Sequence, residues 1–475
     1  MLHHSDLDAE QLAAIEYLQH RTESLIALPV GFGKTIIALT ALKKVREVYG
    51  PWRTLLVSTK SICEHTWSDE LVRWSHLPAL RYATAAGRNR AAALLGADIT
   101  GVNFESLEWY LDLVDAGEVA LPEILIIDES SKMKGETVSR VTRLAGLRRI
   151  TKKDGVKHVR KYPGYVHRFR RRWLLSATPA PEGYQGLWAQ EAVMSPRRRL
   201  GENPTSFRDQ YCMRPRSGFG WVVVPSLESS IEEKLKHVMY LPKKEEYLNL
   251  LPATHSKVIV PWETEARAQY DEMEDQLMLT LEQEDPDVSM DEIDVVAPNA
   301  GVLLSKLKQI CSGFLYDQNK VAHPTADPDA KRVALDAVIE RTGGSPLLVF
   351  TQFRAEREDL AANYRDAQIG LPRSLDDWSN NKIRMLVLHP KSAGHGVNLQ
   401  YGTNVCIYYS LPDSFEQWWQ SWGRLQRRGQ TRPVSVLRMH RPSSVDSESW
   451  QRVQRKKMKL SDFLNNMRAR RHEAG

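Results

Sequence analysis

The chain has 475 residues, 42% of them hydrophobic, which suffices for about three domains of ordinary size. No run approaches the ~18 apolar residues of a membrane span, and the start of the chain does not resemble a secretory signal. Its four cysteines are scattered without a Cys-x-x-Cys pair, which argues against structural zinc and disulfides.

Charge is distributed unevenly along the chain. Residues 140–172 contain thirteen Lys or Arg and a single acid, Asp154, although the whole chain carries only +6. Residues 262–294 contain thirteen Asp or Glu and one Arg267, and the C-terminal part is basic again. Clustered positive charge favours a polyanionic partner, most often nucleic acid. The alternative is that each block is only a solvated surface.

The first predicted site is "LPVGFGKT" at residues 28–35. It follows the phosphate-loop pattern G-x-x-x-x-G-K-[ST], with leucine in place of the first glycine. An apolar run precedes it and helically spaced apolar residues follow, which predicts the strand, turn and helix that such a loop requires. Gly31 and Gly33 would allow the turn, Lys34 would reach the β/γ-phosphates and Thr35 would hold Mg²⁺. A glycine turn that only caps a core helix is the alternative.

Two adjacent carboxylates end a later apolar run. In "EILIIDESS" the run leads into Asp128 and Glu129. A Mg²⁺-dependent phosphate enzyme needs one carboxylate to organise the metal, and the next can orient the attacking water. A cap at the strand end is the alternative, but the position between the phosphate loop and "LLSATP" favours catalysis.

Apolar runs of strand length alternate with helical patterns in two parts of the chain. The first part contains "RTLLVS", "DITGV", "EILIID" and "RRWLLS", and the last contains "PLLVF", "IRMLVL", "NVCIYY" and "VSVLRM". Such alternation predicts parallel sheets covered by helices, and therefore an α/β fold. The region between, from about 185 to 340, has mostly helical patterns.

The ordered motifs resemble a known family. "LDAEQLAAI", "LPVGFGKT", "LLVSTKSICEHTWSDELVRW", "VNFESL", "IIDESSKMKG" and "LLSATPAPEGYQGLW" resemble the first motor lobe of helicase superfamily two, closest to Swi/Snf-type DNA translocases. "LLVFTQF", "VLHPKSAGHGVNLQYGTNVCIYY" and "QWWQSWGRLQRRGQTRPVSVLRM" resemble the second lobe, and "SFRDQYC", "LPATHSKVIV" and "LLSKLKQICSG" keep the family order between them. "SAGHGVNLQ" and the compact second lobe resemble small phage and prophage members. The superfamily also tolerates a residue other than glycine at position 28.

The resemblance implies an α/β protein of two RecA-like parallel-sheet motor lobes with a mostly helical elaboration. We expect lobe 1 at 1–195 with the basic insertion 140–172, a helical region at 196–330, lobe 2 at 331–445, and a basic C-terminal helix at 446–475 that braces the lobes.

The implied activity is hydrolysis of ATP, with Mg²⁺, to translocate along double-stranded DNA. We expect a monomer in the cytoplasm of a bacterial or phage-infected cell, without a membrane partner. Single-stranded or forked DNA and a targeting protein are further candidate partners. A strand-separating helicase with the same ATPase is one alternative function, and a DNA-binding scaffold with a silent ATP site is another.

Residue roles follow from the same resemblance. Gln11 is implied to read adenine, against the alternative of a surface glutamine. "QSWGRLQRRGQ" matches Q-x-x-G-R-x-x-R with Gln420, Arg424 and Arg427, of which Arg427 would be the arginine finger at the γ-phosphate. Its neighbour Arg428 leaves open which arginine inserts. Further cleft and DNA contacts are implied for Gly396, Asn398, Ser176, Thr178, Thr59, Lys60, Asn103, Ser106, Gln352 and Ser392, where a plain strand-end or loop role is the alternative.

Two features are interpreted from the residues themselves. "TKKDGVKHVRKYPG" has turn residues on both sides of a short valine-containing run, which predicts a hairpin or protruding loop. Such a protrusion could clamp the DNA backbone with Lys152, Lys153, Lys157, Arg160 and Lys161. Trp418, Trp419 and Trp422 could stack on bases, but their helical spacing favours packing in a core.

Overall fold

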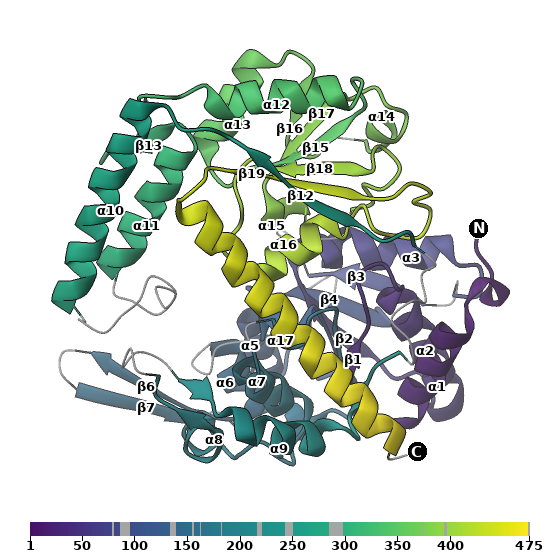
Figure 1. The fold of residues 1–475 in the computed structure, drawn as a ribbon. Helices are drawn as coiled ribbons and strands as arrows, with labels where there is room; N and C mark the ends of the chain where they lie inside the picture. Colours follow the sequence, from purple (N-terminus) through teal and green to yellow (C-terminus); the bar gives the residue numbers. More distant parts are fainter. Residues whose placement is uncertain are drawn as a thin grey trace. The chain divides into compact units, whose positions relative to one another are not determined.

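The computed structural model describes residues 1–77, 80–85, 96–133, 139–153, 156–161, 163–181, 183–215, 221–242, 250–284, 298–372, 374–393 and 397–473. The chain divides into two compact units (Figure 1). Unit 1 comprises Met1–Met213, Val223–Tyr247 and Lys459–Gly475, and unit 2 comprises Arg214–Val222 and Leu248–Met458. The region 196–330, predicted as a helical elaboration, is therefore shared between the two units.

Unit 1 contains a seven-stranded sheet in the order β11-β1-β8-β5-β2-β4-β3, in which the strands run parallel. The strands are β1 (Glu23–Ala27), β2 (Thr54–Ser58), β3 (Tyr82–Thr84), β4 (Ile99–Asn103), β5 (Ile124–Asp128), β8 (Arg171–Ser176) and β11 (Met239–Tyr240). β1, β2, β5 and β8 are buried along their whole length. Burial on both faces explains why they read as continuous apolar runs rather than alternating ones.

The helices of unit 1 lie before, between and after its strands along the chain. They are η1 (His4–Asp6), α1 (Ala9–His20), α2 (Lys34–Tyr49), η2 (Ile62–Thr66), α3 (Trp67–Arg73), α5 (Leu107–Asp115), η3 (Ser130–Lys132), α6 (Ser139–Ala145), η4 (Val166–Arg168), α7 (Gln185–Met194), α8 (Pro204–Tyr211), α9 (Pro225–Leu235) and the last part of α17 (Val445–Glu473). Short strands β9 (Cys212–Met213) and β10 (Val222–Val223) follow α8. The start of α1 is fixed by Asp8, whose carboxylate accepts the backbone N–H of Gln11 at 2.7 Å.

The basic insertion forms the predicted hairpin. β6 (Arg148–Lys153) and β7 (Val156–Lys161) pair antiparallel and project from unit 1 in Figure 1. At its base Gly146 and Gly164 have positive φ, and a Cβ on Gly146 would lie 2.9 Å from Gly164 Cα, so both positions need glycine. The turn at 154–155 and the side chains of the five proposed clamp residues lie outside the described parts.

Part of the basic block is structural. Arg143 is buried and pairs with Asp112 at 2.7 Å and Asp115 at 2.9 Å. Arg172 is also buried and donates from Nε to the carbonyl of Met194 at 2.7 Å. These two arginines hold the insertion to the rest of unit 1 and are not available to a polyanion. The thirteen Lys or Arg of residues 140–172 therefore overstate the positive charge that this segment exposes.

Unit 2 contains a six-stranded sheet in the order β12-β19-β18-β15-β17-β16, also parallel. Its strands are β12 (Thr254–Ile259), β15 (Leu347–Phe350), β16 (Ala367–Ile369), β17 (Met385–Leu388), β18 (Val405–Tyr408) and β19 (Ser435–His440). The four apolar runs predicted as strands are β15, β17, β18 and β19. The edge strand β12 is mostly exposed, which explains the absence of an apolar run there.

The remaining elements of unit 2 surround this sheet. They are α10 (Thr264–Glu284), α11 (Pro298–Cys311), the antiparallel pair β13 (Phe314–Tyr316) and β14 (Ala322–Pro324), α12 (Ala330–Arg341), α13 (Arg354–Asn363), α14 (Asp376–Ser379), α15 (Pro390–Ala393), α16 (Phe415–Trp422) and α17 up to Met458. Figure 1 shows α10 beside α11, with α12 and α13 on one side of the sheet and α15 and α16 on the other. The two helix-covered parallel sheets confirm the predicted α/β class. Among the described residues, no helix is both long and apolar enough to cross a membrane.

Candidate nucleotide and nucleic-acid site

The phosphate-loop sequence lies between β1 and α2, as predicted. Gly31 and Gly33 have φ of 81° and 85°, a region that favours glycine. A Cβ on Gly33 would lie 2.7 Å from Nε2 of Gln11, so a side chain cannot be accommodated there without a shift. Helix α2 begins at Lys34, so the loop ends in the N–H groups and positive dipole end that bind phosphate.

Lys34 and Gln11 both contact the backbone of this loop. Lys34 Nζ donates to the carbonyls of Leu28 at 3.1 Å and Pro29 at 3.3 Å, which places the ammonium group over the loop. The Gln11 amide accepts the N–H of Asp8 at 3.1 Å and donates to the carbonyl of Phe32 at 2.9 Å. Gln11 therefore ties the loop to the start of α1, and its reading of adenine stays a prediction.

The two carboxylates follow directly from β5. Asp128 is buried and accepts the indole N–H of Trp67 at 3.1 Å and the backbone N–H of Glu129 at 3.0 Å. Glu129 is also buried and has φ of 58°, an uncommon conformation for a residue other than glycine. Such strain persists where surrounding structure enforces it, frequently at functional sites.

Ser176 and Thr178 lie beside these groups. Ser176 ends β8, pairs with Ala27 at the end of β1, and accepts the N–H of Thr178 at 3.0 Å. The Thr178 hydroxyl is buried and has no hydrogen-bond partner among the described residues. Because β1, β8 and β5 are neighbours, the three predicted segments meet at the carboxyl edge of one parallel sheet. Ligands of open α/β sheets bind at this edge.

A buried glutamine joins two of these segments. Gln190 on α7 accepts the hydroxyl of Ser130 at 2.9 Å and donates to the carbonyl of Pro179 at 2.6 Å. It therefore links the residue after Glu129 to the residue after Thr178. Sequence reasoning missed Gln190; the signal that could have found it is a polar residue within the apolar run "GLWAQEAVM".

Thr35 and Asp128 are suitable groups for holding Mg²⁺. No cluster of three or more His, Cys, Asp or Glu that could bind a metal occurs among the described residues. Mg²⁺ is usually held by one or two carboxylates together with substrate phosphates, so this single carboxylate beside a phosphate loop fits it.

The candidate DNA contacts of unit 1 lie on the same edge of the sheet. Ser58, which precedes Thr59 and Lys60, pairs with Asn103 at the ends of β2 and β4. Lys60 is exposed, and the Asn103 amide donates to Glu105 at 2.7 Å. Ser106 occupies the N-cap position of α5. Their contacts with DNA stay predictions.

Unit 2 brings Arg427 and Asn398 together. Arg427 donates to the Asn398 side chain at 2.8 Å and to the carbonyl of Val397 at 3.3 Å, whereas Arg428 is exposed. These bonds orient Arg427, and which of the two arginines inserts stays a prediction. Gln420 and Arg424 are buried, and Gly396 lies outside the described residues.

The other two candidates of unit 2 follow strands, Gln352 in the loop after β15 and Ser392 in the short helix α15 after β17. Ser392 is exposed, and its hydroxyl donates to the carbonyl of His389 at 2.7 Å. Gln352 follows β15, and its backbone N–H donates to the hydroxyl of Ser410 at 2.8 Å.

The tryptophans of α16 pack inside unit 2. Trp418 and Trp422 are buried, with ring centroids 5.4 Å and 5.2 Å from that of His255. The packing interpretation is therefore confirmed for Trp418 and Trp422. Trp419 is half-buried and contacts the rings of Phe415 and Trp422. Burial, with Lys457 and Arg438 adding positive charge, lowers the pKa of His255 to about 4.

Residues 10–152 match the SNF2-related domain family model. The chain is 28% identical to protein p41 of Acyrthosiphon pisum secondary endosymbiont phage 1 over 475 residues, covering 95% of this chain and 96% of that protein. It is 23% identical to SWI/SNF-related matrix-associated actin-dependent regulator of chromatin subfamily A member 1 of Mus musculus, covering 93% of this chain and 41% of that protein.

Solved helicase-type structures resemble the fold. The Pyrococcus furiosus Hef helicase domain matches with a TM-score of 0.50 and 14% identity, covering 94% of this chain and 98% of that chain. The Sulfolobus solfataricus SWI2/SNF2 ATPase core, solved with dsDNA, matches with a TM-score of 0.44 and 18% identity, covering 96% of this chain and 92% of that chain. Residues 10–152 are thus similar to the SNF2-related domain, and the resemblance to the Swi/Snf-like group of helicase superfamily two is confirmed.

Proposed function

We propose that this chain is an ATP-driven motor that translocates along double-stranded DNA. The observation that carries the proposal is the meeting of three segments at the ends of β1, β8 and β5. These are the glycine loop with Lys34, the Asp128–Glu129 pair and the Ser176–Thr178 turn. A glycine turn that merely capped a core helix would not need two buried carboxylates at the same sheet edge.

In this proposal the residues of the chain divide the work of hydrolysis. Lys34 and the loop N–H groups hold the phosphates of ATP, and Glu129 orients the attacking water. Arg427 stabilises the charge that develops on the γ-phosphate, as an arginine finger does. Thr35 and Asp128 would hold Mg²⁺, which when bound neutralises phosphate charge.

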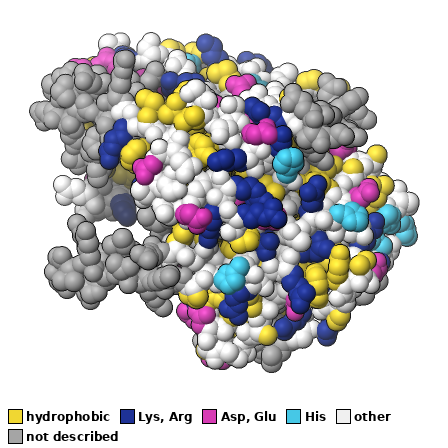
Figure 2. All heavy atoms as spheres, turned by 90° about the horizontal axis from the view of Figure 1, so that it is seen from below, with side chains coloured by type: hydrophobic (Ala, Val, Ile, Leu, Met, Phe, Trp, Pro, Cys, Tyr) yellow, Lys and Arg dark blue, Asp and Glu magenta, His cyan; other side chains and the backbone are white. Residues whose placement is uncertain are grey.

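DNA is proposed as the track because short polar residues follow β2 and β4. Such side chains can hold phosphate oxygens without reading base sequence. The net charge of +6 has the sign that a polyanion requires. Lys and Arg side chains gather over the middle of the face drawn in Figure 2, whereas Asp and Glu are scattered.

The decisive experiment compares ATPase rates without nucleic acid and with single-stranded DNA, duplex DNA and RNA. We expect duplex DNA to stimulate most, Lys34→Ala to abolish nucleotide binding or turnover, and Glu129→Gln to bind ATP without hydrolysing it. Glu118→Gln, on an exposed residue of unit 1, is the matched control. Hydrolysis by Glu129→Gln at the unmutated rate would refute the assignment of the water-orienting group.

Movement is tested separately with a triplex-displacement assay, in which translocation along duplex DNA removes a third strand. We expect displacement that depends on ATP and poor opening of a forked duplex. Efficient unwinding of long blunt duplexes would instead favour a strand-separating helicase. Absence of any stimulation by nucleic acid would favour a silent scaffold.

A further inference from the structure

A buried carboxylate in unit 2 connects three separate segments of the chain. Glu356, in the first turn of α13, is 2% exposed. One carboxylate oxygen accepts the hydroxyl of Ser312, just after α11, at 2.7 Å. The other accepts the hydroxyl of Ser410, just after β18, at 2.7 Å. Glu356 is thus bonded to the end of the α10–α11 helix pair and to the segment that leads into α16.

The same carboxylate also holds the loop before α13. Its second oxygen accepts the backbone N–H groups of Gln352 at 3.0 Å and Phe353 at 3.1 Å. A carboxylate at this position compensates the free N–H groups and the positive end of a helix. The N–H of Ala355, two residues after Phe353, donates to the hydroxyl of Tyr316 at 2.9 Å. Side chains from other elements therefore determine where this loop lies.

A buried lysine compensates the charge through one of the hydroxyls. Lys331, also 2% exposed, donates to Ser312 Oγ at 3.0 Å and to the carbonyl of Tyr409 at 2.6 Å. Buried charges are tolerated when they are paired and fully hydrogen-bonded, and such a network favours one geometry over others. Removing the carboxylate would leave this buried ammonium group without its compensating charge, and would leave the hydroxyls of Ser312 and Ser410 and the N–H of Phe353 without this acceptor.

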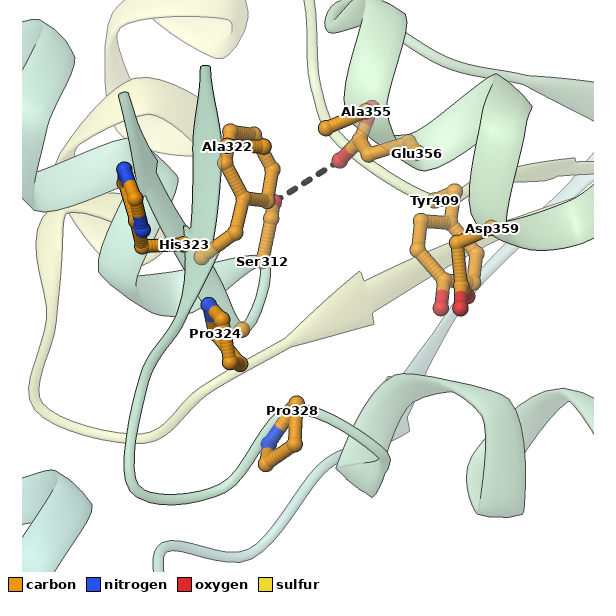
Figure 3. Close-up of a pocket in the computed structure, with 11 residues that line it drawn as sticks. Ser312, Ala322, His323, Pro324, Pro328, Ala355, Glu356, Asp359 and Tyr409 are labelled. Atoms are coloured by element: carbon orange, nitrogen blue, oxygen red, sulfur yellow. Dashed lines mark hydrogen bonds between the residues drawn. The ribbon is translucent and has the colours of Figure 1, made fainter. Parts of the chain in front are cut away.

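The network borders a cavity, so little other packing can replace it. The cavity has a volume of about 170 Å³ and lies between the β13–β14 pair and α13. In Figure 3 Ser312 and Glu356 face each other across it, joined by the hydrogen bond drawn as a dashed line. Asp359 and Tyr409 lie on the α13 side of the cavity, and His323 and Pro324 lie on the β14 side.

We propose that Glu356 is a positioning residue of the motor, which fixes the loop carrying Gln352 against α11 and against the segment entering α16. This rests on the proposed function, in which Gln352 contacts the DNA backbone. Gln352 Nε2 is buried and has no hydrogen-bond partner among the described residues, so no hydrogen bond fixes this amide nitrogen directly. The backbone bonds from Glu356 and Ser410 place this amide instead. The segment after Ser410 continues into α16, and Arg427 follows this helix. The Glu356 carboxylate therefore links the loop that carries Gln352 to the segment that leads to Arg427.

The experiment measures the duplex DNA concentration for half-maximal ATPase and the maximal rate, for full-length Glu356→Ala and Glu356→Gln. We expect Glu356→Ala to raise that concentration by about tenfold to a hundredfold, because small displacements of a positioned group cost this much. Glu356→Gln keeps an acceptor for the loop N–H groups and should recover most of the loss. Direct binding of a fluorescent duplex should change in parallel. If Glu356 only stabilised the fold, its replacement would not selectively raise the DNA concentration for half-maximal ATPase, and Glu356→Gln would not return that concentration towards the unmutated value.

Glu358→Ala is the matched control, since this glutamate lies on the same helix but is exposed and pairs with Arg354 at the surface. If Glu356→Ala does not fold, Ser410→Ala keeps the carboxylate and removes one hydroxyl, and we expect a smaller rise in the same direction. Suppose that the unmutated chain is stimulated by DNA. The inference would then be overturned if folded Glu356→Ala or Ser410→Ala needed the same duplex DNA concentration for half-maximal ATPase as Glu358→Ala. An unmutated chain without DNA stimulation would overturn the proposed function, and this inference with it.

Discussion

Replacement of Gln190 by leucine tests whether the two segments of unit 1 that we propose to be catalytic must be joined. Leucine has a similar volume but cannot accept from Ser130 or donate to the carbonyl of Pro179, which Gln190 does at 2.9 Å and 2.6 Å. Each buried polar group left unsatisfied costs about 1–3 kcal/mol. Two such groups, the Ser130 hydroxyl and the Pro179 carbonyl, predict a loss of roughly 2–6 kcal/mol in the free energy of unfolding of unit 1.

The expected effect on turnover is larger than that on substrate binding. Glu129 precedes Ser130, and Thr178 precedes Pro179, so loss of the hydrogen bonds of Gln190 to these segments would allow groups that we propose to act at the γ-phosphate to shift. We expect Gln190→Leu to lower the kcat of DNA-stimulated ATPase by about tenfold to a hundredfold, with a smaller change in the KM for ATP. Steady-state ATPase and thermal unfolding should be measured together, with Gln185→Leu on the same helix as control. A kcat within about twofold of the unmutated value, alongside the expected loss of stability, would show that Gln190 only packs.

Three further predictions concern other parts of the chain. Arg427→Ala should keep much of the ATP binding but lower turnover by about 10³-fold, and Arg428→Ala should not; equal losses in both ATPase assays would contradict the assignment of the finger. Alanine at all five hairpin positions should weaken duplex binding for every sequence and reduce the slope of log affinity against log salt by up to about 4.5; an unchanged slope in a salt titration would exclude the clamp. Those positions are Lys152, Lys153, Lys157, Arg160 and Lys161. The pKa of His255 is lowered to about 4 in the folded state, below the usual unfolded value of about 6.5, so the unfolded chain binds more protons between these values. Stability should therefore decline as pH falls from 6.5 towards 4, and urea unfolding should show a shallower decline for His255→Phe; identical pH dependence of both proteins would rule out this contribution.

The sequence alone determined the elements that depend on local pattern. The continuous apolar runs became β2, β4, β5 and β8 in unit 1 and β15, β17, β18 and β19 in unit 2. Glycine spacing located the phosphate loop, because only residues that tolerate positive φ can form that turn. The order of strand ends then placed the carboxylates near the loop, since parallel strands share one carboxyl edge.

Strands whose pattern is weak escaped prediction. β12 is an exposed edge strand and β11 has only two residues, so neither offers an apolar run of strand length. Their position is decided by pairing with β19 and β1, which are distant in the sequence. Hydrophobicity averaged over a short window of sequence contains no information about which distant strand will pair with a segment.

Only the tertiary structure decided which polar groups meet. Gln190 and Ser130 are 60 residues apart, and Glu356 and Ser312 are 44 apart, yet each pair shares a buried hydrogen bond. Charge counting could not separate Arg143, which is buried in ion pairs, from residues of the hairpin strands in the same basic block. The physical reason is that local pattern reports periodicity and backbone preference, whereas burial of a polar group depends on a partner that another element supplies.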